Sequence, residues 1–166
     1  MTILRVSGDG WLHHSGKGYR CALGRGGIRA DKREGDGATP VGRYPVRRLL
    51  YRGDRLVRPV SGLPLLEIQQ SDGWCDDPHD TAYNKAVTLP YKASAETMWR
   101  HDGLYDFVVI LGHNDDPVVP GQGSAIFMHV ASPDYGTTEG CVALARTDLL
   151  TVLLDLDGNS EILIKA

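Results

Sequence analysis

The sequence IFMHVASPDYGTTEGCVAL, residues 126–144, carries the features that decide the fold and the chemistry. A β-prone run brings His129 near its end, and a turn-rich loop over residues 132–140 then leads into Cys141 and a second apolar run. Such a loop can fold back and place the imidazole beside the thiol. A neighbouring histidine can remove the proton of a thiol and make the sulfur a strong nucleophile. The spacing alone also allows a plain alternative, in which Cys141 is inert packing and His129 is a core histidine.

A glycine stands directly before this cysteine. Gly140 lets the backbone approach a substrate carbonyl without a side chain in the way. The amides near Gly140 and Cys141 could then donate hydrogen bonds to a developing oxyanion. We therefore expect Gly140 to belong to a catalytic group with Cys141 and His129, and we expect the thiol to lie in a surface cleft.

Outside this stretch the chain favours short strands. Its 20 glycines and 9 prolines separate short β-prone runs, a spacing typical of a sandwich or an open barrel. These runs are Ile3–Val6, Tyr19–Leu23, Tyr44–Leu50, Leu63–Ile68, Phe107–Leu111, Ala125–Val130 and Ile162–Lys165.

Helix signals are few. Thr147–Leu156 has an apolar face and predicts a helix near the C-terminus, and a weaker helix is predicted over Ser94–Arg100. Two long polar stretches, Gly24–Gly42 and Gln69–Tyr91, have no periodicity. We expect them to be loops that line a functional site.

Composition narrows the class of protein. The chain has 166 residues, enough for one domain, and a net charge of −3, which argues against nucleic-acid binding. No apolar run is long enough for a membrane span. The N-terminus lacks the apolar stretch of a secretory signal, so we expect either a mature chain or one not exported by that route.

The other cysteines and the histidines offer rival sites. Cys75 has His79 nearby, but the adjacent carboxylates of Asp76 and Asp77 would raise its pKa. Pairing of Cys75 with Cys21, or simple packing, is the preferred interpretation. Several residues of metal-ligating type match no tight ligand spacing, so no metal site is predicted. These residues are Cys75, Asp77, His79, His113 and Asp115.

Two separated motifs resemble one family. Thr138-Glu-Gly-Cys141, with His129 upstream, resembles the signature of the L,D-transpeptidase (YkuD-like) family: a histidine, a loop, then Ser/Thr-x-Gly-Cys. The segment KREGDGATPVGRY, residues 32–44, is similar to that family's early Asp-Gly-x-Thr-Pro-x-Gly stretch. The segments at 112–115 (GHND) and 121–129 (GQGSAIFMH) resemble a branch of the family. Together they span the chain from about residue 24 to residue 154.

The resemblance implies a mainly β fold: a single sandwich-like L,D-transpeptidase catalytic domain over residues 1–166, with a C-terminal helix. It implies that Cys141 forms a thioester with a peptidoglycan stem peptide, with His129 as the base. The amine of a second stem then resolves the thioester and makes a cross-link. No cofactor is implied. The resemblance also implies a role in cell-wall organisation and cell shape, and a target for carbapenems.

Alternatives stay open at this point. Resolution of the thioester by water would make the protein a wall carboxypeptidase, endopeptidase or amidase, and resolution by a free D-amino acid would give exchange. A non-catalytic wall-binding module is a further alternative, against which the intact His129, Gly140 and Cys141 argue. The substrate implies a periplasmic or wall location, with cytoplasmic turnover of wall fragments as the alternative.

Substrate contacts are predicted mainly around the motifs. Many family members have histidine where this chain has Glu139, and arginine or asparagine where it has Ala143; the nearest arginine is Arg146. Glu139 could attract an acceptor amine, or it could be a solvated turn residue. The predicted substrate-binding residues are His113, Asn114, Thr138, Glu139, Trp74, Tyr83 and Arg146.

Overall fold

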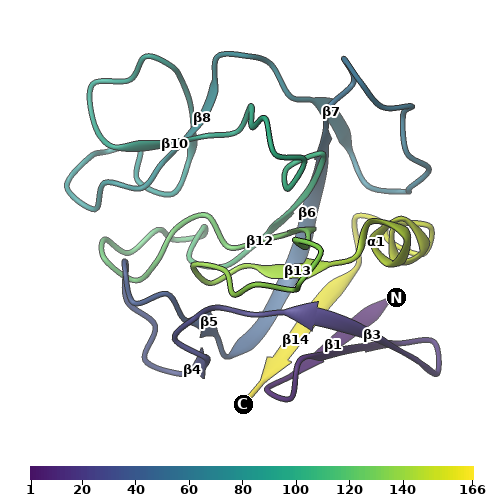
Figure 1. Cartoon of the computed structure of the whole chain (residues 1–166). Helices are drawn as coiled ribbons and strands as arrows, with labels where there is room; N and C mark the ends of the chain where they lie inside the picture. The colour runs from purple at the N-terminus through teal and green to yellow at the C-terminus, as the bar shows by residue number, and fades with distance from the viewer.

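The computed structural model describes the whole chain, Met1–Ala166, as a mainly β domain. Nine strands form its large sheet: β1 (Ile3–Ser7), β2 (Trp11–His14), β3 (Lys17–Ala22), β6 (Gly42–Tyr51), β7 (Leu65–Glu67), β11 (Phe107–Leu111), β12 (Phe127–Val130), β13 (Val142–Leu144) and β14 (Glu161–Lys165). Their order is β11-β12-β13-β3-β2-β1-β14-β6-β7. The long strand β6 also pairs with β11, so the sheet returns on itself in a sandwich-like arrangement (Figure 1).

The main core lies inside this folded sheet. Alternate residues of the strands point inward, as a side-chain period of two requires: Ile162 and Ile164 of β14 are fully buried between half-exposed neighbours. The single helix α1 (Arg146–Leu153) packs Leu149, Val152 and Leu153 into the same core. It lies beside β13 in Figure 1.

Strand β11 is buried on both faces. Phe107, Val109 and Leu111 pack into the main core, whereas Val108 and Ile110 belong to a second, smaller apolar cluster on the opposite face. A continuous run of apolar residues is what a strand covered on both sides needs. The second face is therefore also covered by protein, and it is the face that carries the candidate site.

A small three-stranded sheet stands apart from the large one. It consists of β8 (Asp72–Cys75), β9 (Ala86–Thr88) and β10 (Ala95–Thr97), in the order β10-β8-β9 (Figure 1). Two further short strands, β4 (Ile28–Arg29) and β5 (Thr39–Pro40), pair in parallel within the first long polar stretch.

Most of the predicted elements are confirmed, since each predicted β-prone run contains a strand and α1 begins one residue before the predicted start. The helix ends at Leu153 and not at Leu156, because the last bonds, such as Leu156 N–H to Leu153 O, tighten to three-residue turns. Strand β2 and strand β13 were not predicted.

Two predictions in the polar half of the chain are wrong. Residues Ser94–Arg100 form no helix, because β10 pairs with β8 and this pairing overrides local helix propensity. The polar stretches are not only loop either: Gly24–Gly42 contains β4 and β5, and Gln69–Tyr91 contains β8 and β9. Their polar composition hides these short strands.

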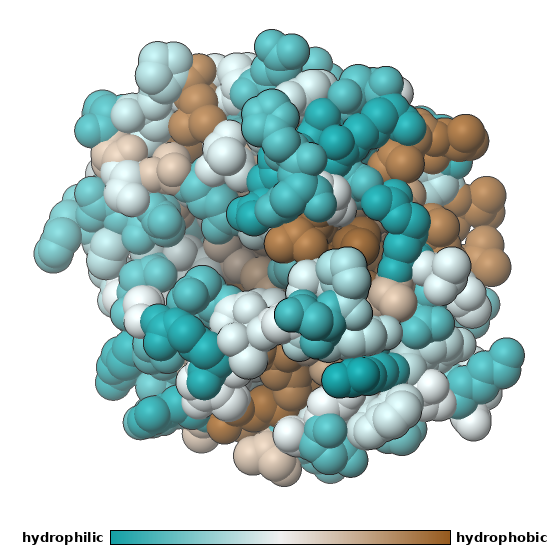
Figure 2. Space-filling model, in the orientation of Figure 1, coloured by the Kyte–Doolittle hydropathy of each residue, from teal (hydrophilic) through white to brown (hydrophobic).

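The surface has no large continuous apolar face in the view of Figure 2, where separate hydrophobic areas lie among hydrophilic side chains. Exposed large hydrophobic residues include Val57, Val60, Leu66 and Leu154. The single helix α1 is neither long nor apolar enough to cross a membrane.

Candidate active site

Two neighbouring strands bring the predicted catalytic residues to one face. β12 and β13 run parallel, and His129 is paired with Ala143. Because side chains alternate along a strand, Cys141, two residues before Ala143, points to the same face as His129. Both side chains line one cavity of about 460 Å³. The cavity lies on the second face of the sheet and also contacts the small sheet through Asp76 and Glu96.

The Cys141 thiol is held by the segment that leads into β12. Its Sγ donates to the Ala125 carbonyl oxygen at 3.3 Å and accepts a hydrogen bond from the Phe127 N–H at 3.4 Å. Only 7% of Cys141 is exposed, and it packs in the second apolar cluster. The prediction that the thiol lies in a surface cleft is therefore wrong, because the thiol lies at the inner wall of a cavity.

Burial sets the protonation state of the pair. It raises the pKa of the Cys141 thiol to about 12, with the Glu96 carboxylate acting in the same direction. Burial lowers the pKa of His129, because the imidazolium form loses its hydration. At neutral pH both groups are thus uncharged, and the resting site holds a thiol and an imidazole in place of a thiolate–imidazolium pair.

The backbone fixes the tautomer of His129. Its Nδ1 lies 2.9 Å from the Val130 carbonyl oxygen. A carbonyl oxygen can only accept, so Nδ1 carries the hydrogen and the lone pair of Nε2 remains free to take a proton. The ring also contacts Tyr105 edge-on, with centroids 5.2 Å apart.

Gly140 is required by conformation and by space. Its φ of +135° is a conformation that side-chain-bearing residues rarely adopt, and a Cβ there would lie 2.6 Å from the Ala38 carbonyl oxygen. The Gly140 N–H donates to Thr138 Oγ1 at 3.1 Å. The Cys141 N–H has no hydrogen-bond partner, which leaves it as the free amide beside the thiol.

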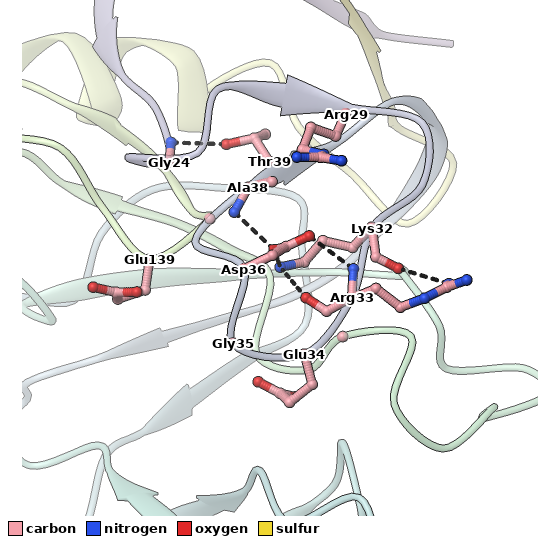
Figure 3. A network of polar contacts seen from close by, with 12 residues as sticks. Gly24, Arg29, Lys32, Arg33, Glu34, Gly35, Asp36, Ala38, Thr39 and Glu139 are labelled. Atoms are coloured by element: carbon pink, nitrogen blue, oxygen red, sulfur yellow. Dashed lines mark hydrogen bonds and ion pairs between the residues drawn. The ribbon is translucent and has the colours of Figure 1, made fainter.

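The early motif packs against this turn. In Figure 3 the Asp36 carboxylate lies at the centre of a network: it accepts from Lys32 Nζ at 2.5 Å, from the Arg33 N–H at 2.8 Å and from the Ala38 N–H at 2.9 Å. Since Ala38 abuts Gly140, Asp36 supports the turn that precedes Cys141. The two motifs, far apart in the chain, are thus in direct contact in the fold.

We expect Asp36→Asn to destabilise the protein in a pH-dependent manner. Burial pushes the pKa of Asp36 up, but Lys32 and the two amides outweigh it and bring the pKa to about 2. A carboxyl with a depressed pKa stabilises the fold above its unfolded pKa of about 4, and this contribution is lost as the pH falls through the folded pKa. The free energy of unfolding of the variant should be lower by about 2 kcal/mol at pH 7.

Urea denaturation of both proteins at several pH values measures this difference. It should shrink between about pH 4 and pH 2, where the wild-type carboxyl takes up its proton. Asp31→Asn is the matched control, because Asp31 pairs with Arg29 on the surface and should contribute little. A difference of equal size at pH 2 and pH 7 would contradict the electrostatic account.

Several residues that line the cavity were not predicted from the sequence, among them Glu96, Arg100 and Tyr105. Glu96 lies near the thiol and accepts a hydrogen bond from the Tyr105 hydroxyl, and burial raises the pKa of this carboxyl. The Arg100 side chain also lines the cavity and forms an ion pair with Asp102. Glu96 and Arg100 come from the segment that was predicted as a helix. No local motif marked them, because the pairing of β10 with β8 brings them to the site.

Two of the predicted substrate-binding residues lie at the cavity. Thr138 lines it, but its hydroxyl donates to the Cys141 carbonyl oxygen at 2.7 Å, which fixes the turn. Glu139 lines it too and pairs with Arg25 Nε at 3.0 Å. Both partners are exposed, so this ion pair contributes little to stability.

The other five are not brought into this cavity. The buried Tyr83 donates to Glu34 Oε1 at 2.7 Å, and Arg146 forms an ion pair with Asp106. The Asn114 amide organises its own loop through the Val119 and Gly123 backbones. Trp74 lines a second cavity of about 740 Å³, to which Phe127 contributes and Cys141 does not.

His113 is buried with 9% exposed, and its Nδ1 has no hydrogen-bond partner. Burial lowers its pKa to about 4, so the ring is neutral at physiological pH. It packs edge-on against Tyr44 at 5.3 Å between centroids. The structure therefore places this imidazole in a packed region outside the cavity of Cys141.

The rival cysteines are free and buried. Cys21 and Cys75 form no disulfide, so the predicted alternative of a pairing between them is wrong, and the alternative of simple packing is confirmed. Burial raises the pKa of both thiols. Neither thiol lines the cavity that holds His129.

The fold and the cavity define a mainly β domain with a thiol and an imidazole on one face of its sheet. The family model of the L,D-transpeptidase catalytic domain (YkuD) matches residues 5–162. The chain therefore belongs to the YkuD family of L,D-transpeptidase catalytic domains. A comparison with curated protein sequences finds no match.

Solved structures with a similar fold include the helical cell shape determining protein Pgp2 from Campylobacter jejuni, at 17% identity and a TM-score of 0.49. That match covers 99% of this chain and 47% of the other. An L,D-transpeptidase from Mycobacterium smegmatis is 10% identical, with a TM-score of 0.48 and coverage of 99% and 58%. One from Mycobacterium tuberculosis H37Rv is 12% identical, with a TM-score of 0.48 and coverage of 99% and 57%. The chain thus spans about half the length of these structures.

Proposed function

We propose that this protein is a cysteine-dependent L,D-transpeptidase that cross-links peptidoglycan stem peptides through a thioester on Cys141. The observation that carries the proposal is the shared cavity of Cys141 and His129, in which the Val130 carbonyl leaves His129 Nε2 free as a base. Membership of the family supports peptidoglycan as the substrate. The substrate in turn favours a periplasmic or wall location.

The first half of the reaction forms the thioester. As the neutral imidazole takes the thiol proton at Nε2, the sulfur attacks the carbonyl carbon between the L-centre of a stem residue and the following D-amino acid. The resulting oxyanion accepts a hydrogen bond from the free Cys141 N–H. Collapse breaks the C–N bond, and His129 returns the proton to the leaving D-amino acid.

The second half releases the enzyme. The amine of a second stem peptide gives a proton to His129 and attacks the thioester carbon, and the sulfur leaves with that proton as the thiol. Neutral starting forms suit this sequence, because the pKa of the thiol is raised and that of the imidazole lowered. In this sequence His129 takes the thiol proton only when substrate is bound, so no reactive thiolate is present between turnovers.

The acceptor could approach along the side of the cavity that carries Glu139. Its carboxylate is exposed and would attract an ammonium group, although Arg25 neutralises part of its charge. Glu139 therefore serves acceptor binding only weakly in this proposal. Carbapenems would acylate Cys141 by the same attack on a strained amide.

Product analysis tests the proposal. Purified protein is incubated with disaccharide-tetrapeptide muropeptides, and the products are separated by liquid chromatography and identified by mass spectrometry. We expect cross-linked dimers together with free D-amino acid. Tripeptide alone, with ¹⁸O incorporated from labelled water, would identify a carboxypeptidase that uses the same thioester. Unchanged muropeptides would contradict both.

A further inference from the structure

The Asn84 side chain has a complete set of hydrogen bonds in the interior. Only 5% of Asn84 is exposed. Its Oδ1 accepts from Trp74 Nε1 and from the Ala125 N–H, both at 3.0 Å. Its Nδ2 donates to the His113 carbonyl oxygen at 3.0 Å and to the Asn114 carbonyl oxygen at 2.8 Å. Two pure donors face the oxygen and two pure acceptors face the nitrogen, so the orientation of the amide is fixed.

One of these bonds leads directly to the nucleophile. Ala125, whose N–H is bound by Asn84, accepts the hydrogen bond of the Cys141 thiol at its carbonyl oxygen. Ala125 has a φ of +54°, a left-handed conformation that is unfavourable for a residue with a Cβ. Such a conformation persists only where the surroundings hold it. The Asn84 bond is one such restraint on the peptide that holds the sulfur.

We propose that Asn84 is a positioning residue for the Cys141 thiol. It holds the Ala125 peptide in the left-handed conformation in which that carbonyl directs the sulfur, while the Phe127 N–H, two residues on, supports the sulfur from the other side. Asn84 also ties this segment to β8 through Trp74, and so couples the small sheet to the site. The inference rests on the proposed role of Cys141 as the nucleophile.

Three variants test this role. Asn84→Ala removes the acceptor of the Ala125 N–H, whereas Asn84→Asp keeps an acceptor oxygen there but places the other oxygen against two carbonyls. Both should lower the melting temperature, because each loses buried hydrogen bonds. Ser160→Ala is the matched control for stability alone, since Ser160 is buried and its hydroxyl binds only Asp157, away from the cavity.

The expected results separate positioning from stability. In folded Asn84→Ala, kcat should fall by roughly 10–100-fold with little change in KM, as a displaced nucleophile predicts. In Ser160→Ala, kcat should stay within about threefold of wild type, whereas Asn84→Asp, which keeps an acceptor for the Ala125 N–H, should retain more of the wild-type kcat than Asn84→Ala. If Asn84→Ala does not fold, Asn84→Ser takes its place, because the shorter serine side chain cannot reach the Ala125 N–H: a kcat at least tenfold below wild type with an unchanged KM supports the proposal, and a wild-type kcat overturns it.

A second readout needs no substrate. The rate of iodoacetamide modification of Cys141 at pH 8, followed by peptide mass spectrometry, is the quantity measured. It should rise several-fold in Asn84→Ala, because the thiol then loses the S–H···O bond that favours its neutral form. The increase should be smaller in Asn84→Asp, which keeps an acceptor for the Ala125 N–H. If the wild-type protein shows no turnover, but the variants differ from it in alkylation as described, the proposed function is contradicted and the positioning role is supported. Equal alkylation and equal kcat in folded Asn84→Ala and wild type would overturn the inference.

Discussion

Cys141→Ala should give a folded protein with no measurable turnover. The substitution removes the only thiol that shares a cavity with His129, and loss of a nucleophile commonly costs several orders of magnitude in kcat. It also leaves the Phe127 N–H and the Ala125 carbonyl without their sulfur partner. We therefore expect a loss of about 1–2 kcal/mol in the free energy of unfolding, which is too small to unfold a domain of this size.

The measurement is product formation from tetrapeptide muropeptides, with circular dichroism to show that the variant is folded. Cys75→Ala is the matched control, because Cys75 is fully buried and lies outside the cavity. That variant should lose stability and keep its turnover per folded molecule. The reverse outcome, with Cys141→Ala active and Cys75→Ala inactive, would show that the nucleophile has been assigned to the wrong cysteine.

His129→Gln should lower kcat/KM by about 10²–10⁴-fold, the range that general bases contribute. The same variant tests the protonation state of the site. Burial lowers the pKa of His129, so the neutral base is present at pH 7 and remains present below the usual histidine pKa of about 6.5. The acid limb of the wild-type pH profile should therefore lie below pH 6.5, and His129→Gln should lose this limb.

Turnover measured between pH 4.5 and pH 9 gives both results. His79→Gln is a suitable control, because His79 is exposed and distant from the lining of the cavity. It should keep the wild-type profile. An acid limb above pH 6.5 would mean that the pKa of the imidazole is raised, as in a thiolate–imidazolium pair, and the neutral thiol–imidazole pair would then be wrong.

Much of the fold could be predicted because strands and turns leave local signals. Runs such as Phe107–Leu111 are apolar throughout, and glycine and proline mark their ends. The strands of the small sheet left no such signal in the sequence. Apolar and polar residues alternate only weakly along β8 and β10, and the two strands depend on each other for pairing. Local propensity pointed to a helix at Ser94–Arg100, and long-range pairing decided otherwise.

The candidate site was predictable where chemistry is local in sequence. His129, Gly140 and Cys141 lie within thirteen residues of one another along the chain, and His129 and Cys141 line the cavity, with Gly140 directly before Cys141. Glu96, Arg100 and Asn84 come from distant segments, and nothing in their own neighbourhoods distinguishes them from surface residues. The burial of the thiol was also unpredictable, because it results from the small sheet covering the second face.

The central claim is that substrate becomes attached to Cys141 as a thioester, and rapid acid quenching with intact-protein mass spectrometry tests it most directly. The protein is mixed with a tetrapeptide muropeptide, without acceptor, and quenched at short times. We predict one added muropeptide per chain, less the terminal D-amino acid, mapped to Cys141 by peptide sequencing, released by hydroxylamine and absent from Cys141→Ala. A substrate adduct mapped to Cys21, Cys75 or a hydroxyl residue, or steady product formation in Cys141→Ala, would contradict the account.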